Sequence, residues 1–130
     1  MDMTQILSRI AIFAAALALP ASAHAGSIEG KWKSAKGTMI VNVAPCGNSH
    51  CGTVIWAAER HRKKGVTIGA RVLTNLHAVG DGVYKGRAFD PRHKISGQAT
   101  IRQAGPNAMI VRGCAIAGVI CKENRWTRVG

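Results

Sequence analysis

Acidic side chains are scarce in this 130-residue chain: six Asp and Glu stand against eighteen Lys and Arg, so the formal net charge is +12 at pH 7. Asp81 and Asp90 occur in turn sequences, which explains them without a role in acid–base chemistry. The sequence also lacks paired carboxylates, a G-x-S-x-G elbow and a phosphate-binding glycine loop. We therefore expect a protein that is not an enzyme.

Aromatic residues are also few, at 5% of the chain. Proteins that bind single-stranded nucleic acid place exposed aromatic rings along a basic groove, whereas most of the aromatics here are needed for a small core. We expect no nucleic-acid partner. The positive charge favours an anionic component of the cell envelope instead, such as anionic lipid, lipopolysaccharide or an acidic protein, or else a merely solvated surface. The densest charge run, residues 59–64, is predicted to be an exposed loop that ends at Gly65. Its candidate anion-binding residues are Arg60, Arg62, Lys63 and Lys64.

Long hydrophobic runs are absent, and the longest, residues 10–19, is too short to be a transmembrane helix, which needs about 20 apolar residues. Arg9 precedes this run, and Pro20 and the A-x-A-like sequence 23–25 follow it. The pattern is typical of a secretory signal peptide. We expect a signal peptide over residues 1–25, cleaved after Ala25, and a single β-barrel domain over residues 26–130 in the periplasm or outside the cell.

Cysteine is limited to four residues, Cys46, Cys51, Cys114 and Cys121. An even number of cysteines in an exported domain predicts disulfides. Three connectivities are open, and the close spacings favour Cys46–Cys51 and Cys114–Cys121. A metal or redox site at Cys46, His50 and Cys51 is the alternative, but the chain has no C-x-x-C and oxidised cysteines do not bind metals. We expect no metal and no cofactor.

The stretch from residue 38 to residue 57 is predicted to form a hairpin, because two β-rich runs flank the loop C-G-N-S-H-C. If Cys46 faces Cys51, Val43 lies opposite Val54 and Val41 lies opposite Trp56. Alternate residues of a strand point to the same side, so the hairpin has one strongly apolar face. The candidate ligand-lining residues on that face are Met39, Val41, Val43, Val54 and Trp56.

The rest of the chain reads as short strands separated by turns, with fifteen glycines and no convincing helix. Pairing Cys114 with Cys121 predicts Arg112 opposite Glu123 and Met109 opposite Trp126. Residues 66–79 fit either a short strand or a helical turn. Six to eight short strands at regular spacing suggest an all-β barrel or sandwich. We expect an all-β fold, a small antiparallel β-barrel stapled by disulfides.

A series of motifs, in this order, resembles the domain-of-unknown-function family 2147 of exported bacterial proteins. They are G-K-W at 30–32, P-C-G-N-S-H-C-G at 45–52, D-G-V-Y-K-G-R-A-F-D-P at 81–91, V-R-G-C at 111–114 and W-T-R-V at 126–129. The resemblance covers nearly all of the exported part and implies a small exported β-domain, with no established activity. The chain departs from the family after the Asp-Pro turn, where residues 92–95 lack an aromatic that the family often has.

The two ends of the domain also resemble lipocalin-like (calycin) barrels, in which a G-x-W opens the first strand and an arginine of the last strand packs over that tryptophan. Gly30, Trp32 and Arg128 occupy those places, and Trp126 completes a C-terminal W-x-R. An arginine over an indole face is a favourable cation–π contact that would close the barrel. The alternative is that both tryptophans are ordinary core residues.

These observations favour a binding module that takes a small apolar or amphipathic ligand. An eight-stranded barrel has room for one such ligand, or it is filled by its own side chains. The alternative function is a cell-envelope interaction protein that acts through its basic surface. We expect a monomer in either case.

Overall fold

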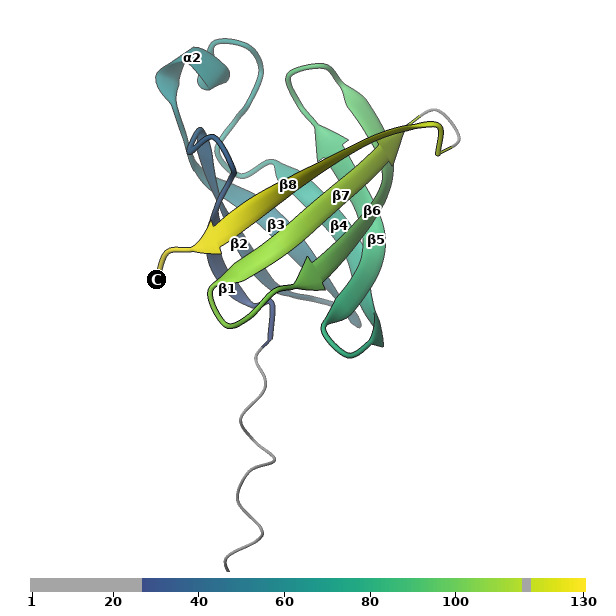
Figure 1. The fold of residues 1–130 in the computed structure, drawn as a ribbon. Coiled ribbons are helices and arrows are strands. Elements are labelled where there is room, and N and C mark those ends of the chain that lie inside the picture. The colour runs from purple at the N-terminus through teal and green to yellow at the C-terminus, as the bar shows by residue number, and fades with distance from the viewer. Residues whose placement is uncertain (1–26, 116–117) are drawn as a thin grey trace, which may run out of the picture.

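The computed structural model describes residues 27–115 and 118–130, in which eight antiparallel strands close into a barrel (Figure 1). Each strand lies beside its neighbours in sequence, and β1 pairs with β8 to complete the ring. The strands are β1 (Gly30–Lys33), β2 (Met39–Cys46), β3 (Ser49–Ala57), β4 (Arg71–Gly80), β5 (Val83–Asp90), β6 (Ile95–Gln103), β7 (Ala108–Ala115) and β8 (Ile120–Arg128). The predicted all-β antiparallel barrel is confirmed, while the predicted signal peptide, residues 1–25, lies outside the described residues.

The connection between β3 and β4 differs from the sequence prediction at one point. Glu59–Arg62 forms a single helical turn, α2, where we expected only loop. The backbone N–H groups of Arg62 and Lys63 donate to the carbonyls of Ala58 and Glu59 and close this turn. Beyond it, the open choice for residues 66–79 is settled, since β4 accounts for most of them. None of the helices in the described residues has the length and apolar character that crossing a bilayer requires.

Both predicted disulfides are present, Cys46–Cys51 and Cys114–Cys121. Such bonds persist in oxidising compartments, so they are consistent with an extracellular or periplasmic environment. Cys114 and Cys121 lie directly opposite each other on β7 and β8. This confirms the predicted register of that hairpin, with Arg112 facing Glu123 and Met109 facing Trp126.

The predicted register of the β2–β3 hairpin is wrong. Val41, not Val43, lies opposite Val54, and the two cysteines are not cross-strand partners. The strands are joined by a two-residue turn, Gly47–Asn48, in which Gly47 adopts a φ of 67° that favours glycine. Because this short turn sets the register, Cys51 faces Ala44 and the disulfide runs diagonally across the hairpin.

Trp56 does not share the inner face of the hairpin, contrary to the prediction. The pairing shifts between Ile40 and Val41, so that Ile55 is an extra residue on β3. An extra residue breaks the alternation of a strand. Ile55 and Trp56 are therefore both outside, with exposed fractions of 40% and 46%.

One half of the barrel is packed solid. Nine large apolar side chains there are essentially inaccessible to solvent: Ile28, Trp32, Val41, Val43, Val54, Leu73, Leu76, Ile101 and Met109. Several of them, such as Ile28, Ile101 and Met109, lie toward the end that carries the β2–β3, β4–β5 and β6–β7 turns, which we call the closed end. No polar or charged side chain is buried within residues 27–115 and 118–130. The barrel is thus held at this end by apolar burial.

Arg128 joins the last strand to the beginning of the barrel. Its guanidinium lies over the ring of Trp32, with the central carbon 4.3 Å from the ring centroid. The same guanidinium donates to the carbonyls of Ser27 (2.9 Å), Glu29 (2.6 Å) and Pro106 (2.8 Å). One side chain therefore ties β8, the segment before β1 and the β6–β7 turn together.

Gly30 makes room for this arrangement. A Cβ at position 30 would lie 2.5 Å from Nη1 of Arg128, and the φ of Gly30 is 128°, a conformation unfavourable for other residues. Gly30, Trp32 and Arg128 thus lie together as the G-x-W and arginine pattern implies. Trp126, which we had grouped with them, lies two residues before Arg128 on β8, opposite Met109.

Replacing Arg128 with alanine should lower the free energy of unfolding by about 2 kcal/mol, because three hydrogen bonds and the cation–π contact are lost together. Urea unfolding followed by circular dichroism measures this change. Arg125→Ala, on the exposed side of the same strand, is the control and should change stability by less than about 0.5 kcal/mol. Equal effects of the two substitutions would show that Arg128 does not hold the closure.

Candidate functional site

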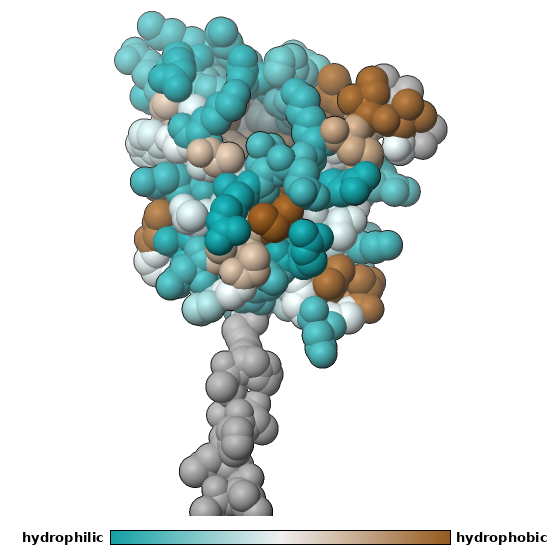
Figure 2. Space-filling model, in the orientation of Figure 1, coloured by the Kyte–Doolittle hydropathy of each residue, from teal (hydrophilic) through white to brown (hydrophobic). Residues whose placement is uncertain are grey.

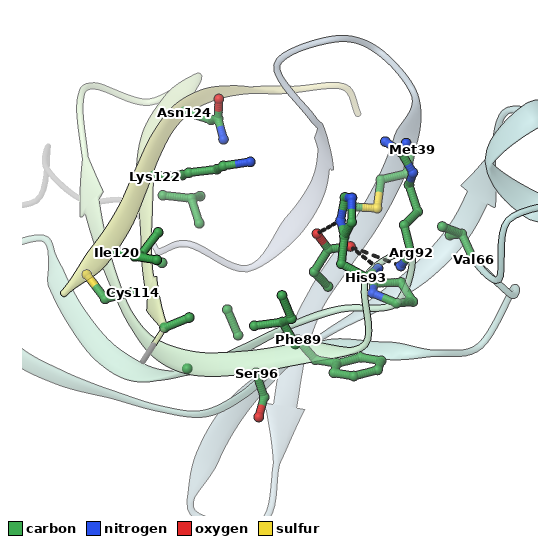
Figure 3. Close-up of a pocket in the computed structure, with 18 of the residues that line it drawn as sticks. Met39, Val66, Phe89, Arg92, His93, Ser96, Cys114, Ile120, Lys122 and Asn124 are labelled. Carbon is green, nitrogen blue, oxygen red and sulfur yellow. Dashed lines mark hydrogen bonds and ion pairs between the residues drawn. The ribbon is translucent and has the colours of Figure 1, made fainter. Parts of the chain in front are cut away.

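The barrel is hollow at the end opposite its closed end. This end carries α2 and the β1–β2, β5–β6 and β7–β8 connections, and we call it the mouth (Figure 1). A cavity of about 480 Å³ lies there, lined by residues of β2, β5, β6, β7, β8 and the β3–β4 connection (Figure 3). The interior of the barrel is therefore filled in one half and open in the other.

The cavity exists because the inner positions of three adjacent strands carry very small residues. Ala88 on β5 faces Gly97 on β6, and Ala99 on β6 faces Gly113 on β7. Gly97 has no space for a side chain, because an added Cβ would overlap the carbonyl oxygen of Cys114. A Cβ at Gly113 would meet only the methyl group of Ala88, at 3.8 Å. A side chain at position 113 would therefore extend into free space.

The deeper walls of the cavity are apolar. Val66, Val111 and Trp126 line it and are themselves buried, and Met39 packs against the same core. Among the residues expected to line a ligand, only Met39 borders this cavity. Val41, Val43 and Val54 do face the interior, but they are fully packed in the core and do not line the cavity.

Polar side chains gather near the opening. Lys122 and Asn124 extend from the inner side of β8 into the cavity, and Arg92 and His93 lie across from them on the β5–β6 turn (Figure 3). The sequence-based search missed all four. A signal existed for the first two, because residues 120, 122, 124 and 126 alternate along β8 and so share the face of Trp126.

Asp90 organises the β5–β6 turn. Its carboxylate accepts hydrogen bonds from the backbone N–H of Arg92 (2.9 Å) and that of His93 (3.4 Å), and it bonds Nδ1 of the His93 ring at 2.7 Å. Burial alone would raise the pKa of Asp90, but the hydrogen bonds from the His93 ring and from the two backbone N–H groups outweigh it and lower the pKa below 3.8. Asp90 is therefore ionised at neutral pH, and its carboxylate is engaged in hydrogen bonds within the β5–β6 turn.

His61, from α2, reaches the lining of the cavity. Desolvation lowers the pKa of His61, and the positive charges of Arg92, Arg60 and Lys64 lower it further. Its imidazole is neutral at pH 7, since the shift is downward from 6.5. The permanent cations of the cavity lining are therefore Arg92 and Lys122.

The four candidate anion-binding residues lie together on and just after α2, at the mouth, and all are exposed. Two of them also make contacts within the chain. Arg62 donates from Nε to the carbonyl of Ala57 at 3.2 Å, and Nζ of Lys63 lies 3.6 Å from the carboxylate of Glu59. The exposed ion pair contributes little to stability.

The alternative metal site at Cys46, His50 and Cys51 is not assembled. Both cysteines are oxidised, and His50 bonds the carboxylate of Glu29 at 2.8 Å and packs edge-on against the ring of Tyr84. Over residues 27–115 and 118–130, no three His, Cys, Asp or Glu side chains come together in a way that could hold a metal ion.

A strand meander closed by an arginine over a tryptophan, with an open cavity at one end, defines a small lipocalin-like barrel. The chain belongs to the family described as "Uncharacterized protein conserved in bacteria (DUF2147)", whose model matches residues 30–128. That match runs from the first residue of β1 to the last residue of β8. Neither the curated proteins nor the solved structures give a significant match.

The Asp90 turn predicts a defined loss of stability in acid. Because the pKa of Asp90 is lowered in the folded state, its stabilisation is complete above 3.8 and is lost as the pH falls through the folded-state value. Asp90→Asn should therefore be less stable than the unaltered protein at pH 7, by under about 1 kcal/mol for a half-exposed group, and this deficit should be smaller at about pH 2. Urea unfolding at both pH values measures the difference.

Asp81→Asn is the matched control, because Asp81 lies in the β4–β5 turn and its carboxylate makes no hydrogen bond within the described part of the chain. It should show no such pH-dependent difference. A stability gap for Asp90→Asn that persists unchanged in acid would contradict the assignment.

Proposed function

We propose that this protein binds a small amphipathic ligand in the cavity at the mouth of its barrel. The apolar part of the ligand lies against Val66, Val111 and Trp126, and its anionic or hydrogen-bond-accepting end points toward Lys122 and Arg92. The observation that carries this proposal is the cavity itself, about 480 Å³ of open interior in a barrel whose other half is tightly packed.

The size and the lining of the cavity support a ligand of this kind. Pockets for small molecules typically enclose about 300–1,000 Å³, with mostly apolar walls and a few polar groups that orient the ligand. Here the buried walls are apolar and the polar groups lie at the opening. The net charge of +12 favours an anionic rather than a cationic end group.

The proposal is for binding rather than catalysis. Asp90 is the one carboxylate in the cavity lining of the described residues, and its hydrogen bonds to the β5–β6 turn already occupy it. The ring of His93 bonds Asp90, and no hydroxyl or thiol lies within hydrogen-bond distance of that ring among the described residues. An acid–base pair without a nucleophile beside it is better explained as part of the turn.

The proposed place of action is outside the cytoplasm, as a monomer in the periplasm or secreted. The signal-peptide pattern of residues 1–25 supports export, and the two disulfides are consistent with it.

Filling the cavity should abolish binding without unfolding the protein. Gly113→Leu places a large side chain in open space at a position whose φ is not in the left-handed region. We expect at least a tenfold weaker affinity for 1-anilinonaphthalene-8-sulfonate, an amphipathic fluorophore, measured by fluorescence titration, and no loss of thermal stability, because the new side chain buries apolar surface.

Gly80→Leu is the control for this substitution, since Gly80 lies near the closed end and also has free space around its Cα. It should bind the fluorophore like the unaltered protein. If Gly113→Leu binds the dye as tightly as Gly80→Leu does, the cavity is not the binding site.

The role of Lys122 can be separated from that of the apolar walls. Lys122→Met keeps the length of the side chain and removes its charge, so the affinity for the sulfonated fluorophore should fall about fivefold while that for the uncharged N-phenyl-1-naphthylamine is unchanged. Lys85→Met, on the outside of β5, should alter neither. Equal losses for both dyes would show that Lys122 contributes packing and no charge recognition.

A further inference from the structure

The exposed apolar side chains are distributed unevenly between the two ends of the barrel. Of the eight large ones that are exposed in the described residues, seven lie toward the mouth and Val79 alone lies near the closed end. The seven are Ile55, Trp56, Ile68, Phe89, Ile95, Val119 and Ile120. These residues belong to three parts of the chain: the end of β3 with the connection after it, the β5–β6 hairpin and the β7–β8 hairpin. They therefore lie on different sides of the opening.

The mouth also carries a concentration of positive charge. Its exposed side chains include the lysines and arginines Lys33, Lys36, Arg60, Arg62, Lys63, Lys64, Arg71, Arg92 and Lys94. Figure 2 shows hydrophilic side chains over α2 and a hydrophobic patch at the β7–β8 connection, on opposite sides of the upper end. The carboxylates of Glu59 and Asp90, at the same end, are engaged with Lys63 and His93.

We propose that the mouth docks on a lipid surface that carries anionic headgroups. The apolar side chains enter the boundary between headgroups and acyl chains, and the cations contact the phosphates around them. Surface-bound proteins combine apolar and basic groups on one side in this way, and tryptophan prefers the interfacial zone of a bilayer. Docking would place the opening of the cavity against the membrane.

A lipid surface fits this end better than an acidic protein does. The apolar side chains lie on separate connections around an open cavity. A protein partner would therefore need a surface whose shape is complementary to all of them. A fluid headgroup layer adapts to separate protrusions and supplies negative charge at every point around them. The docking proposal needs no ligand in the cavity and therefore does not depend on the proposed function.

The first test is association with vesicles, measured by sedimentation and by tryptophan fluorescence. Trp56 is 46% exposed, whereas Trp32 and Trp126 are buried, so a shift of the emission to shorter wavelength on binding reports Trp56 entering the interface. We expect association with vesicles of phosphatidylglycerol and phosphatidylcholine that weakens as salt rises, and little with phosphatidylcholine alone. No association with the anionic vesicles, or equal association with both kinds, overturns the proposal.

The second test asks whether the mouth is the docking side. Arg60→Gln with Lys64→Gln removes two charges from the mouth, and Lys85→Gln with Arg102→Gln removes two charges from the half toward the closed end. At about fivefold per charge, the first variant should bind anionic vesicles roughly 25-fold more weakly. The second should change binding by less than about threefold, because its charges face away from the lipid. Equal losses would mean that net charge alone drives association and would overturn docking through the mouth.

The contribution of the apolar side chains can be tested with a matched pair of exposed valines, one at each end of the barrel. Val119, 77% exposed, lies at the mouth, and Val79, 56% exposed, lies near the other end. Val119→Ser should weaken vesicle binding about fivefold and Val79→Ser should leave it unchanged. Identical binding of the two variants contradicts insertion of the rim.

The cavity variant separates this proposal from the proposed function. Gly113→Leu should still bind anionic vesicles fully, because the exposed rim residues that would contact the lipid, such as Arg60, Lys64 and Val119, lie outside the cavity lining. Loss of dye binding together with intact vesicle binding supports both proposals, whereas loss of vesicle binding in this variant contradicts a docking surface confined to the rim.

Discussion

The contact of Arg128 with Trp32 carries the closure of this barrel. β1 has only four residues and meets β8 at two paired positions, whereas β2 and β3 share eight. A sheet with so short a seam would leave two strand edges exposed to pairing with other chains. The guanidinium extends the seam beyond the strands by binding three backbone carbonyls and covering the indole ring. Closure is what fixes the positions of all the connections at the mouth.

The interior is divided by side-chain size. Large residues such as Leu76, Ile101 and Met109 fill the half that Arg128 closes, and alanine and glycine line the walls of β5, β6 and β7 toward the mouth. Apolar burial stabilises a fold in proportion to the area removed from water, so the packed half supplies most of that stabilisation. The other half can then remain open, which is the condition for binding a ligand in a domain of this size.

Much of the fold follows from the sequence because the signals are local. Cys114 and Cys121 face each other on adjacent strands, so the disulfide alone gave the register of the β7–β8 hairpin. The same inference failed for Cys46 and Cys51, because a disulfide also spans diagonal positions and the short turn at Gly47 decides the register. The outward position of Trp56 depends on an extra residue in β3, which a strict alternation of inner and outer positions does not reveal. An interior ligand site was one of the two expectations, but its position and most of its lining were missed, because a glycine in a strand, such as Gly113, indicates an empty inner wall only once the pairing of the strands is known.

The two ends of the barrel differ in charge and in apolar surface. Lys122 is a useful example: it lies on the inner face of β8 and yet remains exposed, because the cavity admits water to it. A lysine at an inner position would be costly in the packed half, where burial without a partner disfavours its charged form. It is tolerated only where the interior is open to water, and that same opening is where the proposed ligand would meet the ammonium group of Lys122. The small residues of the inner walls, the polar groups on the inner face and the exposed apolar side chains thus all belong to the open end of the barrel.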